Sequence, residues 1–292
     1  MNALTIILMI LSIFLIIIVL VFVCSAFELG RFKVTDYHVN EGVPEFLKGK
    51  RIIFLSDYHE AENGKFNQKL LNKARELSPY LILLGGDMIN ANEMPSDCHP
   101  AKELINGLAD ISDVIYAFGN HEDKMALDIY GTGADINDFL SELKDNVHIL
   151  RNDKYYINKT DKSDGVIYGI DFPLESYRRF SVPEFTADDI DQLVGKKEDA
   201  YSILLGHAPD FFEGYSSWKA DIVLSGHFHG GIVRLPIIGG VISSRFKLFP
   251  RYDYGVYIKG NTRMIVTNGL GQHSLKLRLN NVPEIVCIHF DK

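Results

Sequence analysis

Two short motifs each place two possible metal ligands at alternate positions. They are Asp57-x-His59 and His227-x-His229. In an extended backbone, alternate side chains point to the same face, so each motif could direct both of its donors to one site. Carboxylate and imidazole groups together suit Mn, Fe, Zn or similar divalent ions. The chain has no cysteine cluster, which argues against a structural zinc site.

Five hydrophobic segments of the chain end in residues that can bind a metal. The residues that follow these segments are, in order, Asp57 with His59, Asp87, Asn120 with His121, His207, and His227 with His229. A single Asp after a strand is usually a turn residue, and a single His is more often structural than a ligand. A random chain would not repeat this pattern at five successive ends. Because open α/β sheets bind ligands beyond the carboxyl ends of their strands, the set predicts one shared metal site.

Glycine precedes four of these positions, as Gly86, Gly119, Gly206 and Gly226. Glycine permits sharp turns and a close approach of the backbone to a neighbouring group. An ordinary turn would explain any one of the four equally well. Together they are consistent with loops that pack tightly around a site.

The order of these blocks resembles that of the calcineurin-like metallophosphoesterase superfamily over residues 51–292. The blocks are D-x-H, G-D, G-N-H-E, G-H and G-H-x-H. Later segments, among them HAPDFF, RLPIIGG, LFPRYDYG, NGLG and VPEI, are similar to a bacterial branch of membrane-associated or exported phosphoesterases. That branch includes enzymes similar to the UDP-diacylglucosamine pyrophosphate hydrolases. The resemblance implies a metal-dependent hydrolase of phosphodiester, pyrophosphate or phosphomonoester bonds.

The resemblance also implies a centre of two divalent ions, with manganese among the candidates. Asp57, His59 and His229 would hold one ion, and Asn120, His207 and His227 would hold the other. Asp87 would bridge the two ions. Two ions about 3.5–4 Å apart can bind a hydroxide between them and polarise the phosphoryl oxygens. The hydroxide would then attack phosphorus in line.

His121 follows the Asn120 ligand and would protonate the leaving oxygen or stabilise its charge, as in similar enzymes. A supporting hydrogen bond is its alternative role. Relatives often have G-D-x-x-D, in which the last Asp orients the catalytic His, whereas this chain has Asn90 at that position. An amide oxygen carries no full charge, so it would stabilise a protonated imidazole less. We expect this change to affect the acid role of His121 more than metal binding.

Other charged residues near these blocks allow two interpretations. Glu122 could support the site or form a surface ion pair, and the ion pair is slightly favoured. Arg178, Arg179 and the cations from Arg245 to Arg251 could contact an anionic substrate or a lipid head group. For most of these cations, solvent-exposed surface is the more ordinary role.

Apolar segments that alternate with amphipathic ones must position these residues. We expect strands at residues 51–56, 81–84, 114–118, 147–150, 166–170, 201–205, 221–224, 255–258, 264–267 and 284–289. We expect helices at residues 69–78, 101–109 and 136–144. Helices alternate with strands early in the chain, and the last third is nearly all strand, which indicates an α/β fold with mixed sheets. The resemblance adds that two mixed β-sheets pack as a sandwich flanked by helices.

The N-terminal segment has the properties of a transmembrane helix. Residues 3–27 carry no charge, and a helix of that length rises ~36 Å, enough to cross a hydrocarbon core of ~30 Å. A cleaved signal peptide would have a basic start and a shorter apolar core. We expect a single-pass anchor at residues 1–28, a linker and first strand at 29–50, and a catalytic domain at 51–292. Arg31 and Lys33 favour a cytoplasmic catalytic domain only weakly, so the side of the membrane stays open.

Composition narrows the range of partners. The chain has 292 residues and a formal net charge of −8, which argues against a nucleic-acid backbone as the main partner. Neither the G-x-S-x-G motif of serine hydrolases nor the P-loop motif of nucleotidases occurs. We expect the partner to be a phosphorylated small molecule or a lipid-linked substrate. The main alternative is a non-catalytic membrane adaptor that keeps the fold, but such a protein would lose several ligands, and none is missing here.

Overall fold

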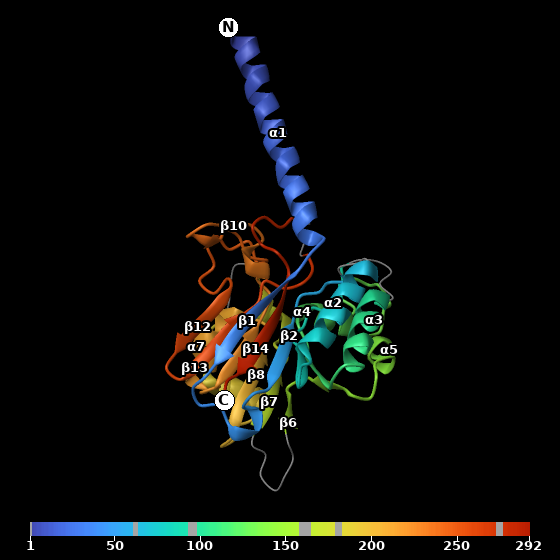
Figure 1. Ribbon diagram of the computed structural model, residues 1–292, viewed down its shortest axis with the longest axis vertical. Coiled ribbons are helices and arrows are strands. Elements are labelled where there is room, and N and C mark those ends of the chain that lie inside the picture. The colour runs from blue at the N-terminus through green and yellow to red at the C-terminus, as the bar shows by residue number, and fades with distance from the viewer. Residues whose placement is uncertain (1, 61–63, 93–97, 158–164, 179–182, 273–276) are drawn as a thin grey trace.

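The structure is a computed structural model that describes residues 2–60, 64–92, 98–157, 165–178, 183–272 and 277–292. Within these residues the chain forms two six-stranded β-sheets, a two-stranded pair and seven α-helices (Figure 1). Six of the helices belong to the folded domain. The first helix, α1 (Ala3–Leu29), extends away from it.

The first sheet is mixed. Its strands lie in the order β1 (Lys33–Val39), β14 (Glu284–Phe290), β2 (Arg51–Leu55), β3 (Leu81–Leu84), β4 (Val114–Ala117) and β5 (Val147–Leu150). The β14–β2 pair is antiparallel and the other pairs are parallel. Because β2, β3 and β4 are parallel, their carboxyl ends lie at the same edge of the sheet. The polar segments that follow them therefore meet at that edge.

The second sheet is also mixed. Its strands lie in the order β12 (Gly255–Lys259), β13 (Thr262–Val266), β9 (Ile222–Ser225), β8 (Tyr201–Gly206), β7 (Gly165–Ile170) and β6 (Asp153–Ile157). The outer pairs β12–β13 and β6–β7 are antiparallel, whereas β8 and β9 are parallel neighbours. The segments after β8 and β9 thus leave the sheet at one edge. A separate small pair joins β10 (Arg234–Leu235) to β11 (Gly239–Gly240).

The two sheets face each other, and helices cover their outer faces. Along β2, Ile52 and Phe54 belong to the core between the sheets, whereas Ile53 and Leu55 belong to the core under the helices. This alternation follows from the two-residue period of a strand, and it explains why a strand buried on both faces is apolar throughout. The helices are α2 (Gly64–Leu77), α3 (His99–Ala109), α4 (Asn120–Ala126) and α5 (Ile136–Ser141) on the first sheet, and α6 (Ala187–Val194) and α7 (Phe212–Ser217) on the second. The predicted α/β sandwich of two mixed sheets is confirmed.

The expected strands are present with ends that shift by at most two residues. Three helices, α4, α6 and α7, and the strands β6, β10 and β11 were not expected from the sequence. Each of these helices has eight residues or fewer, which is too short to show a clear helical period. In α6 a local device starts the helix, because the hydroxyl of Thr186 accepts the N–H of Asp189.

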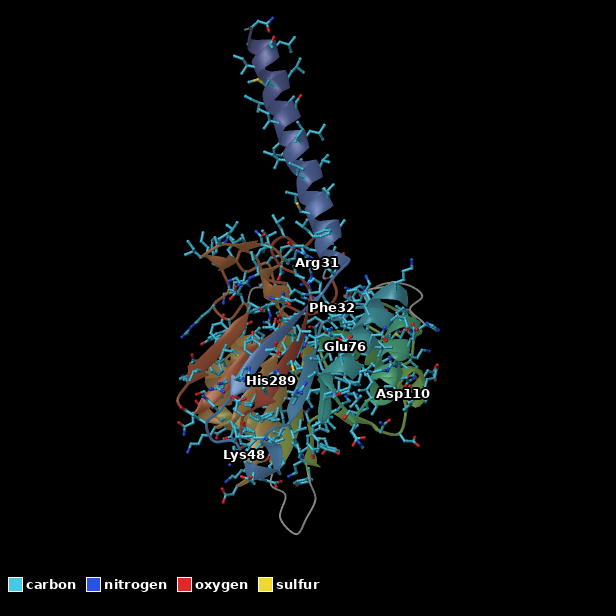
Figure 2. The ribbon with its side chains drawn as sticks, viewed as in Figure 1. Arg31, Phe32, Lys48, Glu76, Asp110 and His289 are labelled. Atoms are coloured by element: carbon cyan, nitrogen blue, oxygen red, sulfur yellow. The ribbon has the colours of Figure 1, made fainter. Side chains whose placement is uncertain are left out.

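Helix α1 differs from every other helix in its exposure. Along most of its length it stands clear of the folded domain, with side chains on all sides (Figure 2), and only Ser25 and Glu28 of this helix are buried. Among the described residues it is the one helix long and apolar enough to cross a membrane, a criterion that a signal sequence would also satisfy. Within the predicted 29–50 segment, β1 pairs with β14, so the chain enters the first sheet directly after α1.

Candidate metal centre

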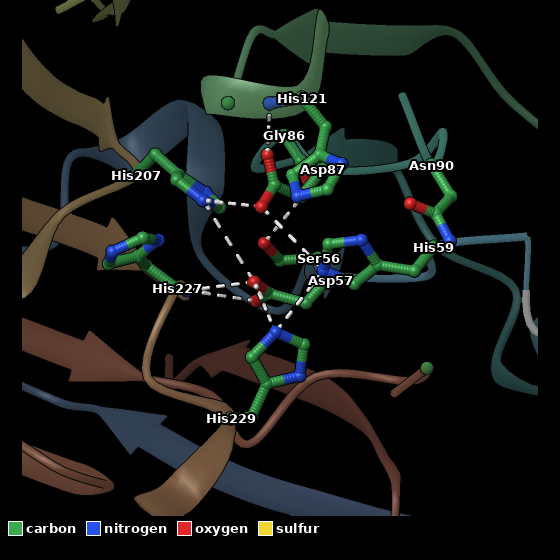
Figure 3. Close-up of polar contacts among 12 residues, drawn as sticks. Ser56, Asp57, His59, Gly86, Asp87, Asn90, His121, His207, His227 and His229 are labelled. Atoms are coloured by element: carbon green, nitrogen blue, oxygen red, sulfur yellow. Dashed lines mark hydrogen bonds and ion pairs between the residues drawn. The ribbon is translucent and has the colours of Figure 1, made fainter. Parts of the chain in front are cut away.

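The predicted ligands lie at five strand ends in the two sheets. In the first sheet, Asp57 and His59 follow β2, Asp87 follows β3, and Asn120 starts α4 after β4. In the second sheet, His207 follows β8, and His227 and His229 follow β9. All seven side chains are buried. Figure 3 shows the Asp and His side chains of this set gathered around one point.

Asp57, His59 and His229 form a first cluster. Their donor atoms lie within 4.8 Å of one another. Nε2 of His229 lies 3.4 Å from Oδ1 of Asp57 and 3.2 Å from Nε2 of His59. Two imidazole nitrogens and a carboxylate oxygen this close together are a donor set typical of a divalent-metal site.

Asp87, His207 and His227 form a second cluster, whose donor atoms also lie within 4.8 Å of one another. Oδ2 of Asp87 lies 3.3 Å from Nε2 of His207 in this cluster. The same oxygen lies 3.6 Å from Nε2 of His59 in the first cluster. One carboxylate oxygen therefore faces both clusters, and this is the position that a bridging ligand requires.

The hydrogen bonding of His207 and of Asn120 also suits metal binding. Nδ1 of His207 lies 2.7 Å from the carbonyl oxygen of Gly85. A carbonyl oxygen can only accept, so Nδ1 carries a proton, and Nε2, which faces the carboxylates, is the nitrogen left to bind a metal. Oδ1 of Asn120 is buried and accepts no hydrogen bond from the residues that the structure describes. A buried amide oxygen without a donor is unfavourable, and a cation at this point would remove the penalty.

The buried carboxylates and imidazoles shift one another's pKa. Burial raises the pKa of Asp57 to about 7. Burial also acts to raise the pKa of Asp87, but the charges of His207 and His121 outweigh it and hold that pKa well below its usual value. Burial acts to lower the pKa of His207, yet the charge of Asp87 raises it to about 9. The two carboxylates therefore draw positive charge into a buried site, and divalent cations would provide that charge.

The backbone at these positions is strained. Five of the predicted ligands have a positive φ, namely Asp57, His59, Asp87, His227 and His229. Asp and His enter this region more readily than most residues, but each such position still costs about 1–3 kcal/mol. Conformations of this kind cluster at functional sites, where the surrounding structure enforces them.

Two of the glycines bring the backbone against the carboxylates. A Cβ atom at Gly226 would lie 2.1 Å from Oδ2 of Asp57, and one at Gly119 would lie 2.4 Å from Oδ1 of Asp87. A side chain cannot occupy either position without displacing a predicted ligand. At these two sites glycine is therefore required by close approach and not merely by a turn.

Glu122 connects the loops that carry the ligands. Its side chain is fully buried, so the favoured prediction of a surface ion pair is wrong. It accepts hydrogen bonds from the backbone N–H groups of Asp87 (2.9 Å), Met88 (2.7 Å) and Gly119 (2.9 Å), and from the hydroxyl of Tyr116 (2.6 Å). The carboxylate thus fixes the loop after β3 against the loop after β4. The residues around Glu122 give no signal for this connection, because Asp87 and Met88 lie in the loop after β3.

Replacing Glu122 with glutamine is expected to lower the free energy of unfolding by about 2–3 kcal/mol, since hydrogen bonds to a buried charged acceptor are lost. An amide has one acceptor oxygen, and its NH₂ group would face donors that now point at a carboxylate. Chemical unfolding curves of the purified chain would measure the change. Glu103→Gln, at an exposed position on α3, is the matched control. Equal stabilities for the two variants would show that Glu122 does not hold the loops.

His121 is held by the loop after β3. Its backbone N–H donates to Oδ1 of Asp87 (2.8 Å), and its Nδ1 accepts the backbone N–H of Ala91 (3.2 Å). The ring proton of a neutral His121 is therefore on Nε2. Oδ1 of Asn90 accepts the N–H of Asn92 (3.2 Å), so an orienting role of this amide toward His121 stays a prediction.

A cavity of about 300 Å³ opens beside the second cluster. Asn120 and His227 line it, and so do three cations, Lys124, Arg178 and Arg245. A cavity with positive walls attracts anions and raises their local concentration. This cavity therefore suits an anionic substrate next to the predicted metal ligands.

Arg245 is not part of the solvent-exposed surface that was expected for most of these cations. Its side chain is 3% exposed. Its Nε donates to Nε2 of His227 (3.1 Å) and lies 3.6 Å from Oδ2 of Asp210. Neither Nη1 nor Nη2 has a hydrogen-bond partner among the described residues. By contrast, the side chain of Arg251 is 75% exposed, and Arg179 lies outside the described residues.

Comparison with known proteins identifies the family. Residues 50–231, more than half of the chain, match the calcineurin-like phosphoesterase family. The chain belongs to this family. It is a member of the calcineurin-like metallophosphoesterases, and the predicted family is confirmed.

Several known proteins are similar in sequence to this metallophosphoesterase. The metallophosphoesterase Cj0846 of Campylobacter jejuni is 30% identical over 257 residues, which are 86% of this chain and 62% of the relative. A zebrafish (Danio rerio) transmembrane protein with a metallophosphoesterase domain is 27% identical, over 88% of this chain and 56% of the relative. The chain thus spans less than two thirds of these two proteins.

The phosphodiesterase YaeI of Escherichia coli is 24% identical over 246 residues, which are 82% of this chain and 81% of the relative. These similarities support the family as a whole. The narrower resemblance to UDP-diacylglucosamine pyrophosphate hydrolases stays a prediction for this metallophosphoesterase.

Proposed function

We propose that this metallophosphoesterase hydrolyses phosphodiester, pyrophosphate or phosphomonoester bonds at a centre of two divalent ions, and that α1 anchors it to a membrane. The observation that supports the centre most strongly is the position of Oδ2 of Asp87, 3.3 Å from His207 in one buried cluster and 3.6 Å from His59 in the other. The proposed ligands are Asp57, His59 and His229 for one ion, Asn120, His207 and His227 for the other, and Asp87 for both. These donors suit Mn, Fe or Zn.

Each residue near the ligands then has a specific task. When bound, the two ions would supply Lewis acidity at phosphorus and a water that is nucleophilic near neutral pH. His121 would donate its Nε2 proton to the leaving oxygen. The N–H of Ala91 occupies Nδ1 of His121 and so keeps the proton on Nε2. Because Asp87 accepts the backbone N–H of His121, the position of the acid is tied to the shared ligand.

Arg245 would bind the phosphoryl group of the substrate. Its Nη1 and Nη2 have no hydrogen-bond partner in the described chain, and Arg245 lines the cavity next to His227 and Asn120. A guanidinium can donate two parallel hydrogen bonds to the oxygens of a phosphate. The ring of Tyr177, 5.5 Å from the guanidinium carbon, supports it from one side. The group is therefore held in place before a substrate arrives.

Replacing Arg245 with glutamine is expected to lower kcat/KM by about 10²-fold, the scale for loss of one preorganised donor. Steady-state hydrolysis of bis-p-nitrophenyl phosphate would measure this, together with inhibition by inorganic phosphate, which should weaken in parallel. Arg251→Gln, in the same segment but exposed, is the matched control and should behave like the wild type. Unchanged phosphate inhibition in the Arg245 variant would exclude this binding role.

The N-terminal part of the chain would place the catalytic domain at a membrane. We assign residues 1–28 to a single-pass anchor, residues 29–50 to a linker and first strand, and residues 51–292 to the catalytic domain. The exposed apolar surface of α1 supports this assignment, because such a surface is unfavourable in water. A phosphorylated small molecule or a lipid-linked phosphoester could then reach the site.

Metal removal tests the proposed function. The purified chain is assayed on bis-p-nitrophenyl phosphate, p-nitrophenyl phosphate and a UDP-linked lipid, before and after dialysis against a chelator. We expect dialysis to abolish turnover and Mn, Fe or Zn to restore it, because the ions supply both the nucleophile and the charge stabilisation. Full activity in a metal-free preparation would contradict the proposal. The substrate that is hydrolysed fastest would identify the preferred bond.

A further inference from the structure

Exposed apolar side chains gather in one segment of the folded domain. Outside α1, eleven large hydrophobic residues of the described chain are exposed. Six of these lie between residues 235 and 249, a segment that we call the apolar loop: Leu235, Ile237, Ile238, Phe246, Leu248 and Phe249. Single exposed apolar residues are ordinary, but a concentration of them marks an interaction surface.

The apolar loop has a defined backbone. Strands β10 and β11 pair within it. The N–H of Val241 donates to the carbonyl of Val233 (2.8 Å), and the N–H of Phe249 donates to the carbonyl of Val241 (2.9 Å). The backbone stretches around Val233, Val241 and Phe249 therefore lie side by side. They hold the six apolar side chains in a fixed arrangement.

The base of the apolar loop is joined to the end of α1. The carboxylate of Glu28 accepts the backbone N–H groups of Asn280 and Asn281, each at 2.9 Å. The carbonyl of Leu279, the residue before Asn280, accepts the N–H of Arg234 (2.9 Å) at the start of β10. Figure 1 shows β10 at the end of the domain from which α1 leaves. The helix end and the loop are thus neighbours held by hydrogen bonds.

Cations accompany both apolar elements. Arg31 follows α1, and its guanidinium carbon lies 4.5 Å from the ring centroid of Phe27. The side chain of Lys247, within the loop, is 53% exposed, and the exposed Arg251 lies just after it. Aromatic and aliphatic side chains beside Lys and Arg suit the boundary between acyl chains and anionic head groups.

We propose that the apolar loop inserts into the surface of the lipid bilayer beside α1. This inference rests on the proposed membrane anchor. If α1 spans the membrane, its last turn lies at the membrane surface, and the hydrogen bonds through Glu28 hold the loop at the same level. Arg245, which lines the cavity, belongs to the same segment, so contact with the membrane would also support one wall of the proposed substrate site.

Quenching of an introduced tryptophan tests the insertion. Ile237→Trp and the control Ile258→Trp are made in the full-length chain, which is reconstituted into vesicles of phosphatidylcholine and phosphatidylglycerol with or without brominated acyl chains. Both positions are exposed, and Ile258 lies on β12, away from the end where α1 leaves. The buried Trp218 gives a background that the unsubstituted chain measures. We expect brominated lipid to remove most of the fluorescence added at 237 and none of that added at 258.

Carbonate extraction of the same vesicles separates the two possible failures. If the chain stays in the membrane fraction but the tryptophan at 237 is not quenched, the insertion is wrong and the anchor stands. If carbonate releases the chain, the anchor is wrong and the inference falls with it. Disulfide cross-links between copies carrying Ile237→Cys, together with an unquenched tryptophan, would assign the loop to contact with a second copy instead.

Discussion

Asp87→Ala is expected to lose both metal ions and to lower kcat by about 10⁴-fold, the scale for removal of a central catalytic group. One oxygen of Asp87 faces both clusters, at 3.3 Å from His207 and 3.6 Å from His59. In the proposed ligand set every other ligand holds one ion, whereas Asp87 holds both, so its loss should weaken both. Metal analysis and steady-state kinetics on the same preparation would measure the two effects.

A matched variant separates loss of the ligand from damage to the loop. Asp87 has φ +52°, a region that Asn tolerates better than Ala. Asp87→Asn should therefore keep the backbone and the hydrogen bond from the N–H of His121, and still lose metal because the bridging charge is gone. Asp110→Ala, at the exposed end of α3, controls for the loss of any surface carboxylate. Normal metal content and turnover in Asp87→Asn would refute the bridging role.

His121→Ala is expected to keep both ions and to lower kcat by about 10²- to 10⁴-fold, the range for a general acid. Nε2 of a neutral His121 carries the proton, since Nδ1 accepts the N–H of Ala91. The decrease in kcat should be small for substrates that release p-nitrophenol, because this good leaving group needs little protonation. It should be large for substrates that release an alkyl alcohol. Comparison of the two substrate types at matched metal content measures the acid role.

A merely supporting role of His121 would give a different pattern. Both substrate types would then slow by the same factor, and metal content would fall with activity. His148→Ala, on β5 of the first sheet, is a control for loss of a remote imidazole. Equal losses on good and poor leaving groups would remove His121 from proton transfer. The result would also show whether Asn90, in place of the Asp of many relatives, leaves the acid function intact.

The ends of the strands and the metal-binding residues that follow them could be predicted from the sequence, because both depend on local sequence pattern. Buried strands such as Leu81–Leu84 are continuous apolar runs, and the polar residue that follows each run marks where it leaves the sheet. Parallel strands then bring Asp57, Asp87 and Asn120 to one edge without any further information. The fold and the family were therefore predictable from strand pattern and motif order.

The roles of Glu122 and Arg245 were not predictable, because their environments come from distant segments. Glu122 lies in the charged stretch NHEDKMA, which is typical of a solvated helix, yet it accepts the N–H groups of Asp87 and Met88 in the loop after β3. Arg245 lies among basic and aromatic residues that suggest a surface, yet His227 and Asp210 enclose it. Burial of a charged side chain depends on tertiary contacts that local composition does not reveal.

Arg278 is another charged residue whose burial could not be predicted from the sequence around it. It is among the largest fully buried side chains, and it donates to the backbone carbonyls of Asn268, Gly271 and Asn281. Burial lowers its pKa to about 10. Arg278 thus fixes the segment from Asn268 to Gly271, which packs against Asp57. The sequence around Arg278 does not indicate this role.

Anomalous X-ray diffraction from crystals grown with Mn²⁺ tests the central claim most directly, because it locates the ions without reference to activity. We expect two peaks about 3.5–4 Å apart, the usual spacing in two-metal hydrolases, with the carboxylate of Asp87 in contact with both. One ion should lie against Asp57, His59 and His229, and the other against Asn120, His207 and His227. A single peak, or peaks that leave Asp87 without a metal contact, would contradict the shared centre.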